Sequence, residues 1–355
     1  MNAQKKCLKG LFSITPVCFL EPRIKLSKHY AVPCRGTEHN NLWMMPSFRP
    51  GDNLPEGISQ IVSSVFPKSR VQSLRILEGG KTNTNVLVQI ENYDDLFVLR
   101  YHLRGSEVCR KEVSLLQALR DVLPVPELIN ADITGDKSGT TYLLYRYVRG
   151  QTFREIRDGG SSRDMADAAC AIGRSMSVLE NFQASSLGHS GLLQRFEIHK
   201  GDFDSPVLCE RLGVDDWLLL HRLHAEWSPM LQNLSNDGSL IHGDFNHRNI
   251  VLRNPRGTWE VAGVLDWELA GTGSFLWDAA RFMCYERPDS KWWEHDFVEG
   301  LRTNSASIPD NWSDLSLTLN TLSAARSLAN RSIPKQFIHE LTVLVRSGLR
   351  GKRIG

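Results

Sequence analysis

The sequence predicts an α+β fold of two lobes, with a small β-rich N-terminal lobe and a larger, mostly helical C-terminal lobe. Three short runs rich in apolar and β-branched residues follow one another at 73–77, 85–91 and 96–101, with turn residues between them, as expected for neighbouring strands. Beyond Gly150 the apolar residues recur mostly at helical spacing. A chain of 355 residues is long enough to bury two cores.

The chain divides into three parts by its pattern. Residues 1–58 contain prolines at 16, 22, 33, 46, 50 and 55 and sustain no amphipathic period, so we interpret them as a flexible extension. Residues 59–148 hold the predicted strands and form the N-lobe. Residues 149–355 form the helical C-lobe.

In the N-lobe a short helix at 58–65 precedes the strands, and a helix at 106–120 follows the third one. Pro124 and Pro126 end that helix, and a hairpin leads into a strand within 141–148. In the C-lobe we expect helices at 164–182, 215–231, 292–302, 315–329 and 335–349. One β-hairpin with arms 249–253 and 259–265 interrupts them, and its Asn-Pro-Arg-Gly turn at 254–257 suits a type I turn.

Composition argues against several classes of protein. The formal net charge of +2 gives no global field for nucleic acid, and no stretch approaches the roughly 20 apolar residues of a membrane span. The seven cysteines are scattered and never spaced as C-x-x-C, which argues against a disulfide framework or a structural zinc site. We therefore expect a cytoplasmic protein with no nucleic-acid or membrane partner, and leave its oligomeric state open.

The densest cluster of chemically useful residues runs from His242 to Glu268. Asp244 lies in a His-Gly-Asp loop, Asn249 opens the hairpin, and Asp266 ends its return arm. Because the two arms are nearly equal in length, the hairpin brings Asp266 back to the loop. A carboxylate that takes a proton, together with an amide oxygen and a second carboxylate for magnesium, is what phosphoryl transfer from ATP requires.

A charged pair is predicted within the N-lobe. Glu112 shares a helix face with Val108, Leu115 and Leu119, so its carboxylate points toward the core and needs a cation. Arg100, at the end of the third strand, is the natural partner. Such a strand-to-helix ion pair holds the ATP phosphates in kinases, although a purely structural pair is the alternative.

A glycine-containing turn lies between the first two strands. Gly79 and Gly80 allow backbone N–H groups to approach phosphate oxygens, and Thr82 and Asn83 add side-chain donors. Taken alone, a Gly-Gly pair between strands indicates only a turn.

Together these segments resemble the aminoglycoside phosphotransferase/choline kinase family, whose fold is similar to that of protein kinases. The resemblance covers roughly residues 70–350 and is most specific at 240–283, where the pattern H-G-D, four residues, N, D-W-E and D-x-A is complete. It implies that Asp244 is the catalytic base, that Asn249 and Asp266 ligate Mg²⁺, and that Asp278 supports the catalytic loop. The glycine turn resembles the family's G-G-x-x-N nucleotide loop.

The resemblance implies that the N-lobe binds ATP and that Arg146 and Tyr147 lie in the hinge beside the adenine. Two positions depart from the pattern: Arg100 replaces the usual lysine, and Arg146 often has an acidic counterpart. The sequence thus predicts an ATP-dependent phosphotransferase with a small hydroxyl-bearing acceptor. A nucleotide-binding pseudokinase or scaffold is the alternative. A protein kinase is disfavoured because no activation segment ending in A-P-E follows Asp266.

Overall fold

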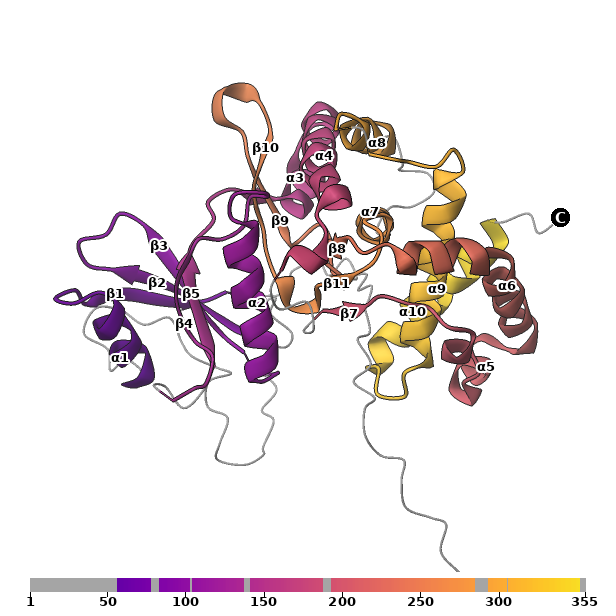
Figure 1. Cartoon of the computed structure of the whole chain (residues 1–355), viewed down its shortest axis with the longest axis horizontal. Coiled ribbons are helices and arrows are strands. Elements are labelled where there is room, and N and C mark those ends of the chain that lie inside the picture. The colour runs from indigo at the N-terminus through magenta and orange to yellow at the C-terminus, as the bar shows by residue number, and fades with distance from the viewer. Residues whose placement is uncertain are drawn as a thin grey trace, which may run out of the picture. The chain divides into compact units, whose positions relative to one another are not determined.

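A computed structural model describes residues 56–77, 83–102, 104–136, 141–187, 193–284, 293–304 and 306–351 (Figure 1). The described residues form two compact units, one within residues 56–197 and 230–316 and a smaller one within residues 198–229 and 317–351. Every candidate site residue belongs to the larger unit. The predicted N-terminal extension lies outside the described residues except for its last three, and the lobe boundary at residue 148 stays a prediction.

The N-terminal part of the larger unit is a five-stranded antiparallel sheet with strand order β1-β2-β3-β5-β4. It confirms the three predicted strands and the hairpin that follows them. The strands are β1 (Val71–Ile76), β2 (Thr84–Ile90), β3 (Leu96–Tyr101), β4 (Leu128–Asp132) and β5 (Tyr142–Arg146).

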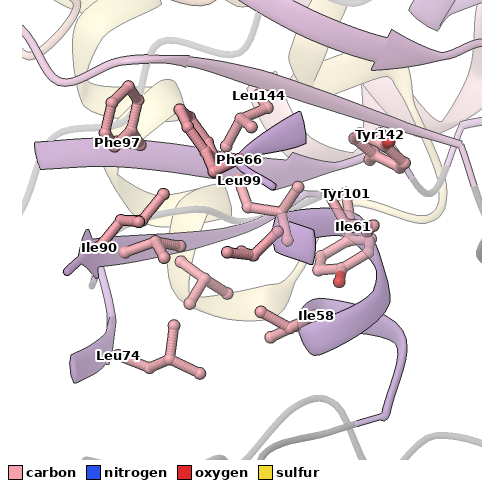
Figure 2. Packing of buried hydrophobic residues seen from close by; sticks show 13 residues of the cluster. Ile58, Ile61, Phe66, Leu74, Ile90, Phe97, Leu99, Tyr101, Tyr142 and Leu144 are labelled. Carbon is pink, nitrogen blue, oxygen red and sulfur yellow. The ribbon is translucent and has the colours of Figure 1, made fainter. Parts of the chain in front are cut away.

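The two faces of this sheet serve different purposes. Along β3, Phe97, Leu99 and Tyr101 point to one face and join a buried cluster with Ile58 and Ile61 of α1 (Glu56–Val65), as Figure 2 shows. Because side chains alternate along a strand, Arg100 between them points to the other face. Helix α2 (Ser106–Leu119) meets Arg100 there through Glu112. One face therefore builds the core, and the other presents charge to the site.

The C-terminal part of the larger unit is mostly helical, with two small three-stranded sheets, β10-β9-β6 and β7-β11-β8. Helices α4 and α8 lie side by side (Figure 1) because Gly173 and Gly300 let their backbones touch; a Cβ at either glycine would lie 2.2 Å from a carbonyl oxygen of the other helix. The elements are β6 (Gln151–Thr152), α3 (Phe153–Gly159), α4 (Ser162–Met176), η2 (Ser177–Asn181), η3 (Ala184–Ser186), β7 (Gln194–Arg195), β8 (Leu240–Ile241), β9 (Ile250–Arg253), η6 (Pro255–Gly257), β10 (Glu260–Val264), η7 (Trp267–Leu269), β11 (Gly271–Thr272), α7 (Leu276–Met283) and α8 (Glu294–Arg302).

The smaller unit is helical in its described residues. Within it, Arg346 pairs with Asp216 at 2.8 Å, and Arg211 donates to the carbonyl oxygen of Leu328 at 2.5 Å. Its elements are η5 (Lys200–Phe203), α5 (Pro206–Leu212), the first part of α6 (Val214–Asn236), the last part of α9 (Trp312–Ala329) and α10 (Lys335–Gly351).

The α+β fold and its long helices are confirmed, and the differences are local. The helix expected at 164–182 is α-helical only to Met176 and continues as the 3-10 turn η2. The turn at 254–257 is not type I, because Arg256 adopts a φ of 63° where that turn needs a negative value. Helices α3 and α5 were not predicted; each has 7 residues, too few for a periodic signal.

Two expectations from composition can be compared with the described residues. None of the described helices is long and apolar enough to cross a membrane. Cys109, Cys170 and Cys209 are free thiols, whereas Cys284 is disulfide-bonded, which the scattered cysteine pattern did not predict.

Candidate active site

The His-Gly-Asp loop begins directly after β8 and depends on a glycine. Gly243 has a φ of +79°, a conformation that side chains rarely adopt, and a Cβ there would lie 2.3 Å from the carbonyl oxygen of Leu269. Only glycine fits both the conformation and the close approach. The loop can therefore turn tightly between His242 and Asp244.

Asp278 anchors this loop from α7. Its buried carboxylate accepts the backbone N–H of His242 at 2.6 Å and that of Gly243 at 2.9 Å. Burial raises the pKa of Asp278 to about 6, although these hydrogen bonds and His242 favour its charged form. The contact matches the supporting role that the family resemblance implied for Asp278.

His242 connects the loop to the return strand of the hairpin. Its Nε2 lies 2.8 Å from the carbonyl oxygen of Leu265, and its Nδ1 lies 3.1 Å from the backbone nitrogen of Asp244. A carbonyl oxygen can only accept and a backbone N–H can only donate. Through these two partners the His242 ring ties the segment before Asp266 to the loop.

The carboxylate of Asp244 is held by two donors and is 24% exposed. Arg281 of α7 donates from NH2 to Oδ1 at 2.7 Å. The side-chain amide of Asn249 donates to Oδ2 at 3.2 Å and to the backbone carbonyl oxygen of Asp244 at 2.9 Å. Both carboxylate oxygens thus have a defined direction, and the group still meets solvent.

Asp266 reaches the same region through the hairpin. The backbone N–H of Leu265 donates to the carbonyl oxygen of Asn249 at 2.8 Å, which places the two predicted magnesium ligands next to each other in the fold. Asp266 adopts the left-handed conformation, with a φ of 67° and a ψ of 65°. Such a conformation in a non-glycine residue is often found at functional sites.

Arg100 lies at the centre of a second charged cluster. The predicted ion pair with Glu112 is present, with Nε 3.5 Å from Oε2. NH2 of Arg100 also contacts Asp266 at 2.5 Å and Glu268 at 3.3 Å. Both Arg100 and Glu112 are buried, and His102 adds an imidazole nitrogen 3.1 Å from Glu112. One guanidinium therefore bridges three carboxylates, which the single nitrogen of a lysine cannot do in the same geometry.

The cluster carries an excess of negative charge around Asp266. Burial lowers the pKa of Arg100, but the carboxylates of Asp266 and Glu112 outweigh it and raise the pKa well above its usual value. Burial raises the pKa of Asp266; Arg100 opposes this rise, and the carboxylates of Glu268, Glu112 and Asp244 add to it. A cation beside Asp266 would relieve this repulsion.

Glu268 joins this cluster to the N-lobe. Its carboxylate accepts the side-chain amide of Asn83 at 2.5 Å, and NH1 of Arg104 lies 3.8 Å away. Nearby, the buried Lys111 of α2 donates to the carbonyl oxygen of Ala270 at 3.0 Å; burial lowers its pKa to about 8. Asn83, Glu268 and Lys111 thus connect the sheet and α2 to the segment after Asp266.

The structure brings together most, but not all, of the predicted site residues. Asp244, Asn249 and Asp266 form one group, and Asn83, Arg100 and Glu112 join it through the carboxylates of Asp266 and Glu268. Gly79, Gly80 and Thr82 lie outside the described residues.

The two predicted hinge residues lie at and directly after the end of β5 and make contacts of their own. The Arg146 side chain pairs with Asp95 and Glu127 and lies 5.8 Å from the Phe97 ring centroid. The backbone N–H of Arg146 donates to Glu127, and that of Tyr147 donates to Leu96. The family often has an acidic residue at this position; here Arg146 instead forms ion pairs at the surface.

Sequence reasoning missed three contributors: His102, Glu268 and Arg281. Arg281 lies three residues after Asp278, so helical spacing could have placed both on one face. Glu268 was noted only as part of D-W-E. Among the described residues no group of three or more His, Cys, Asp or Glu side chains could hold a metal ion; the candidate ligands are instead one amide and one carboxylate.

The chain belongs to the phosphotransferase enzyme family, whose model matches residues 73–311. Its fold is that of the solved kinases in this family. A GDP complex of an aminoglycoside 2'-phosphotransferase-IIIa mutant aligns with a TM-score of 0.63 at 18% identity, over 83% of this chain and 97% of the other. The choline kinase of Streptococcus pneumoniae aligns with a TM-score of 0.55 at 16% identity, over 83% and 98%.

The curated proteins that match this chain are much longer than it is. Acyl-CoA dehydrogenase family member 11 of Pongo abelii is 27% identical over 241 residues, which is 62% of this chain and 29% of that protein. The chain thus spans less than a third of the length of this relative, and the dehydrogenase name does not carry over.

Proposed function

We propose that this chain transfers the γ-phosphoryl group of ATP to a hydroxyl group of a small molecule. The observation that carries the proposal is Asp244, a partly exposed carboxylate whose oxygens are oriented by Arg281 and Asn249 on a loop anchored by Asp278. A new P–O bond forms to the acceptor oxygen, the bond between the β,γ-bridging oxygen and the γ-phosphorus breaks, and ADP leaves. The hydroxyl proton passes to Asp244.

Positioning is the main task of Asp244. Phosphoryl transfer passes through a loose transition state that needs little covalent chemistry from the protein. A carboxylate with a fixed direction can accept the acceptor's O–H hydrogen bond and hold its oxygen in line with the γ-phosphorus. Because Asp244 retains exposure, an acceptor can reach it.

Asn249 and Asp266 fit a magnesium ion. Asn249 donates both of its described side-chain hydrogen bonds from the amide nitrogen, so the amide oxygen is the atom that would face a cation. Asp266 uses Oδ1 toward Arg100, which leaves Oδ2 for the same purpose. Oxygen ligands suit magnesium, and a magnesium ion held by Asn249 and Asp266 would neutralise negative charge on the phosphates of a bound nucleotide.

The nucleotide is proposed to lie against the charged face of the sheet. Arg100, held by Glu112, would contact phosphate oxygens, with Gly79, Gly80, Thr82 and Asn83 around the phosphates and the backbone near Arg146 and Tyr147 beside the base. The solved relative with GDP makes GTP a donor to be tested beside ATP.

The experiment is magnesium-dependent transfer from labelled ATP to a panel of aminoglycosides, amino alcohols, sugars and simple alcohols. Asp244→Ala tests the base, and Asp121→Ala, which removes an exposed carboxylate paired only with its neighbour Arg120, is the control. We expect one acceptor class to yield product that disappears in Asp244→Ala and persists in the control. If wild type, Asp244→Ala and Asp121→Ala all bind nucleotide with magnesium but yield no product from any acceptor, the proposed transfer is contradicted and a pseudokinase is favoured.

A further inference from the structure

Helix α7 is unusual because all eight of its residues, Leu276–Met283, are buried, including the charged Asp278 and Arg281. A charged side chain is rarely buried unless it is paired. Asp278 and Arg281 lie three positions apart, so they project from one side of the helix. Their partners show which task that side has.

Both side chains hold the same three-residue stretch of the loop. Asp278 accepts the backbone N–H groups of His242 and Gly243, while Arg281 donates to the side chain of Asp244, the next residue. The first contact fixes the path of the backbone. The second fixes the direction of the carboxylate itself.

The pair between Arg281 and Asp244 is asymmetric in burial. The side chain of Arg281 is 7% exposed, whereas that of Asp244 is 24% exposed, and NH2 lies 2.7 Å from Oδ1. The cation therefore approaches the carboxylate from the protein side. Solvent, and hence an acceptor, approaches from the other side.

The two carboxylate oxygens of Asp244 receive different donors. Oδ1 faces the guanidinium of Arg281, and Oδ2 faces the amide of Asn249 at 3.2 Å. A carboxylate offers about four lone-pair positions, so two donors leave room for a hydroxyl proton. They also prevent the carboxylate from rotating about its Cβ–Cγ bond.

We propose that Arg281 is a positioning residue for phosphoryl transfer, which keeps the Asp244 carboxylate in the one rotamer that can receive the acceptor's hydroxyl. This role rests on the proposed function of Asp244. Arg281 acts through Asp244 and need not touch nucleotide or acceptor. Its removal should therefore lower kcat more than it weakens nucleotide binding.

The test compares the wild-type chain with Arg281→Met and Arg281→Lys. Turnover of Mg-ATP is followed with the acceptor that the panel identifies and, as a second readout, with water. Because a misplacement of about 1 Å can cost about 10²-fold in rate, we expect Arg281→Met to lose about 10²-fold in kcat with the KM for ATP within about threefold of wild type. Arg281→Lys keeps the charge and should recover at least about tenfold of that loss.

A matched variant separates positioning from folding. Arg346→Met removes another helix arginine that contacts an aspartate at 2.8 Å, in the smaller unit. We expect it to lower the melting temperature as Arg281→Met does, but to leave kcat unchanged. Chemical rescue adds a readout that a structural role would not move: millimolar guanidinium should raise kcat of Arg281→Ala and leave that of Arg346→Met unchanged.

Three results would overturn the inference, and they are distinguishable. Arg281→Met with wild-type kcat would show that Asp244 needs no cation, while the proposed function stands. If Arg281→Met and Arg346→Met lose kcat in the same proportion to their fall in melting temperature, Arg281 is a structural residue only. A wild-type chain that turns over no nucleotide would remove the proposed function and this role with it.

Discussion

Arg281 and Arg100 hold carboxylates in opposite ways. Among the contacts described, Arg281 meets the carboxylate of Asp244, beside a loop whose backbone is already anchored. Arg100 meets three, from Glu112, Asp266 and Glu268. The contact with Arg281 gives a single carboxylate its direction, whereas Arg100 gathers three carboxylates around one guanidinium, and Asp266 among them feels the negative charge of the other two. The first arrangement suits a base, and the second suits a site that receives a cation and then a nucleotide.

The largest effect is expected from breaking the second arrangement at Asp266. Asp266→Asn keeps the shape but removes a charge, so we expect a loss of about 4 kcal/mol in transition-state stabilisation, or about 10³-fold in kcat/KM. Magnesium should also no longer strengthen nucleotide binding, as measured by titration with and without the metal. Glu260→Gln, an exposed acid of β10, is the control. Activity within tenfold of wild type would show that Asp266 holds no essential cation.

Arg100 should matter for stability as well as for activity. Arg100→Met leaves Glu112 buried without its main cation, which should cost about 3 kcal/mol in the free energy of unfolding. Arg100→Lys should lower the free energy of unfolding by about 1 kcal/mol, because lysine keeps the charge but lacks the several coplanar N–H donors of the guanidinium group. Urea unfolding at neutral pH measures both.

The cause of this loss can be checked by a second change. Adding Glu112→Gln to Arg100→Met should restore part of the stability, since the uncompensated buried charge is then gone. No recovery in the double variant would place the loss in packing instead of charge.

A neutral histidine of the loop predicts a pH dependence. His247 lies between the carbonyl oxygen of Phe282 and the guanidinium of Arg157, and burial, then Arg157, lower its pKa to about 3. Since the unfolded value is about 6.5, its contribution to stability is present above about pH 6.5 and is lost as the pH falls toward 3. Relative to that of His247→Gln, the free energy of unfolding of the wild type should fall by about 2 kcal/mol between pH 7 and pH 5.

Asp278 makes an opposing contribution, because its raised pKa of about 6 makes the folded state gain stability on acidification. That contribution is the same in wild type and in His247→Gln, so it cancels in the difference between their free energies of unfolding. His339→Gln, at an exposed position, controls for the loss of a histidine. A constant difference between wild type and His247→Gln across this range would mean that His247 is not buried as a neutral ring.

The smallest effect is expected far from both clusters. Arg253 and Glu260 pair across β9 and β10 with both side chains exposed. Exposed pairs contribute little, so Arg253→Ala should change the free energy of unfolding by less than about 0.5 kcal/mol and leave kcat unaltered. A larger loss would show that the hairpin itself transmits strain to Asp266.

Much of the site could be predicted from local pattern. The spacing of Asp244, Asn249 and Asp266 around a hairpin of nearly equal arms was enough to place them together, because strand pairing determines which residues meet. The pairing of Arg100 with Glu112 followed from one glutamate on an apolar helix face. These predictions needed only periodicity and the cost of burying a charge.

Other features had no local signal. The side chain of Arg146 pairs with Asp95 and Glu127, 51 and 19 residues away in the sequence, and no local pattern predicted these pairs. Asn83 and Glu268 are 185 residues apart, and no periodicity links them. Their contact depends on how the sheet packs against the segment after Asp266.

The sequence by itself determined the α+β class, most of the longer helices and strands, and the groups proposed to carry out phosphoryl transfer, because periodicity, turn chemistry and motif spacing are local properties. Tertiary structure alone decided the other charge contacts: that Arg100 also meets Asp266 and Glu268 and that Arg281 holds Asp244. The reason is physical. A buried charge must find a partner wherever the packed fold places one, and that place is set by contacts between residues far apart in the chain.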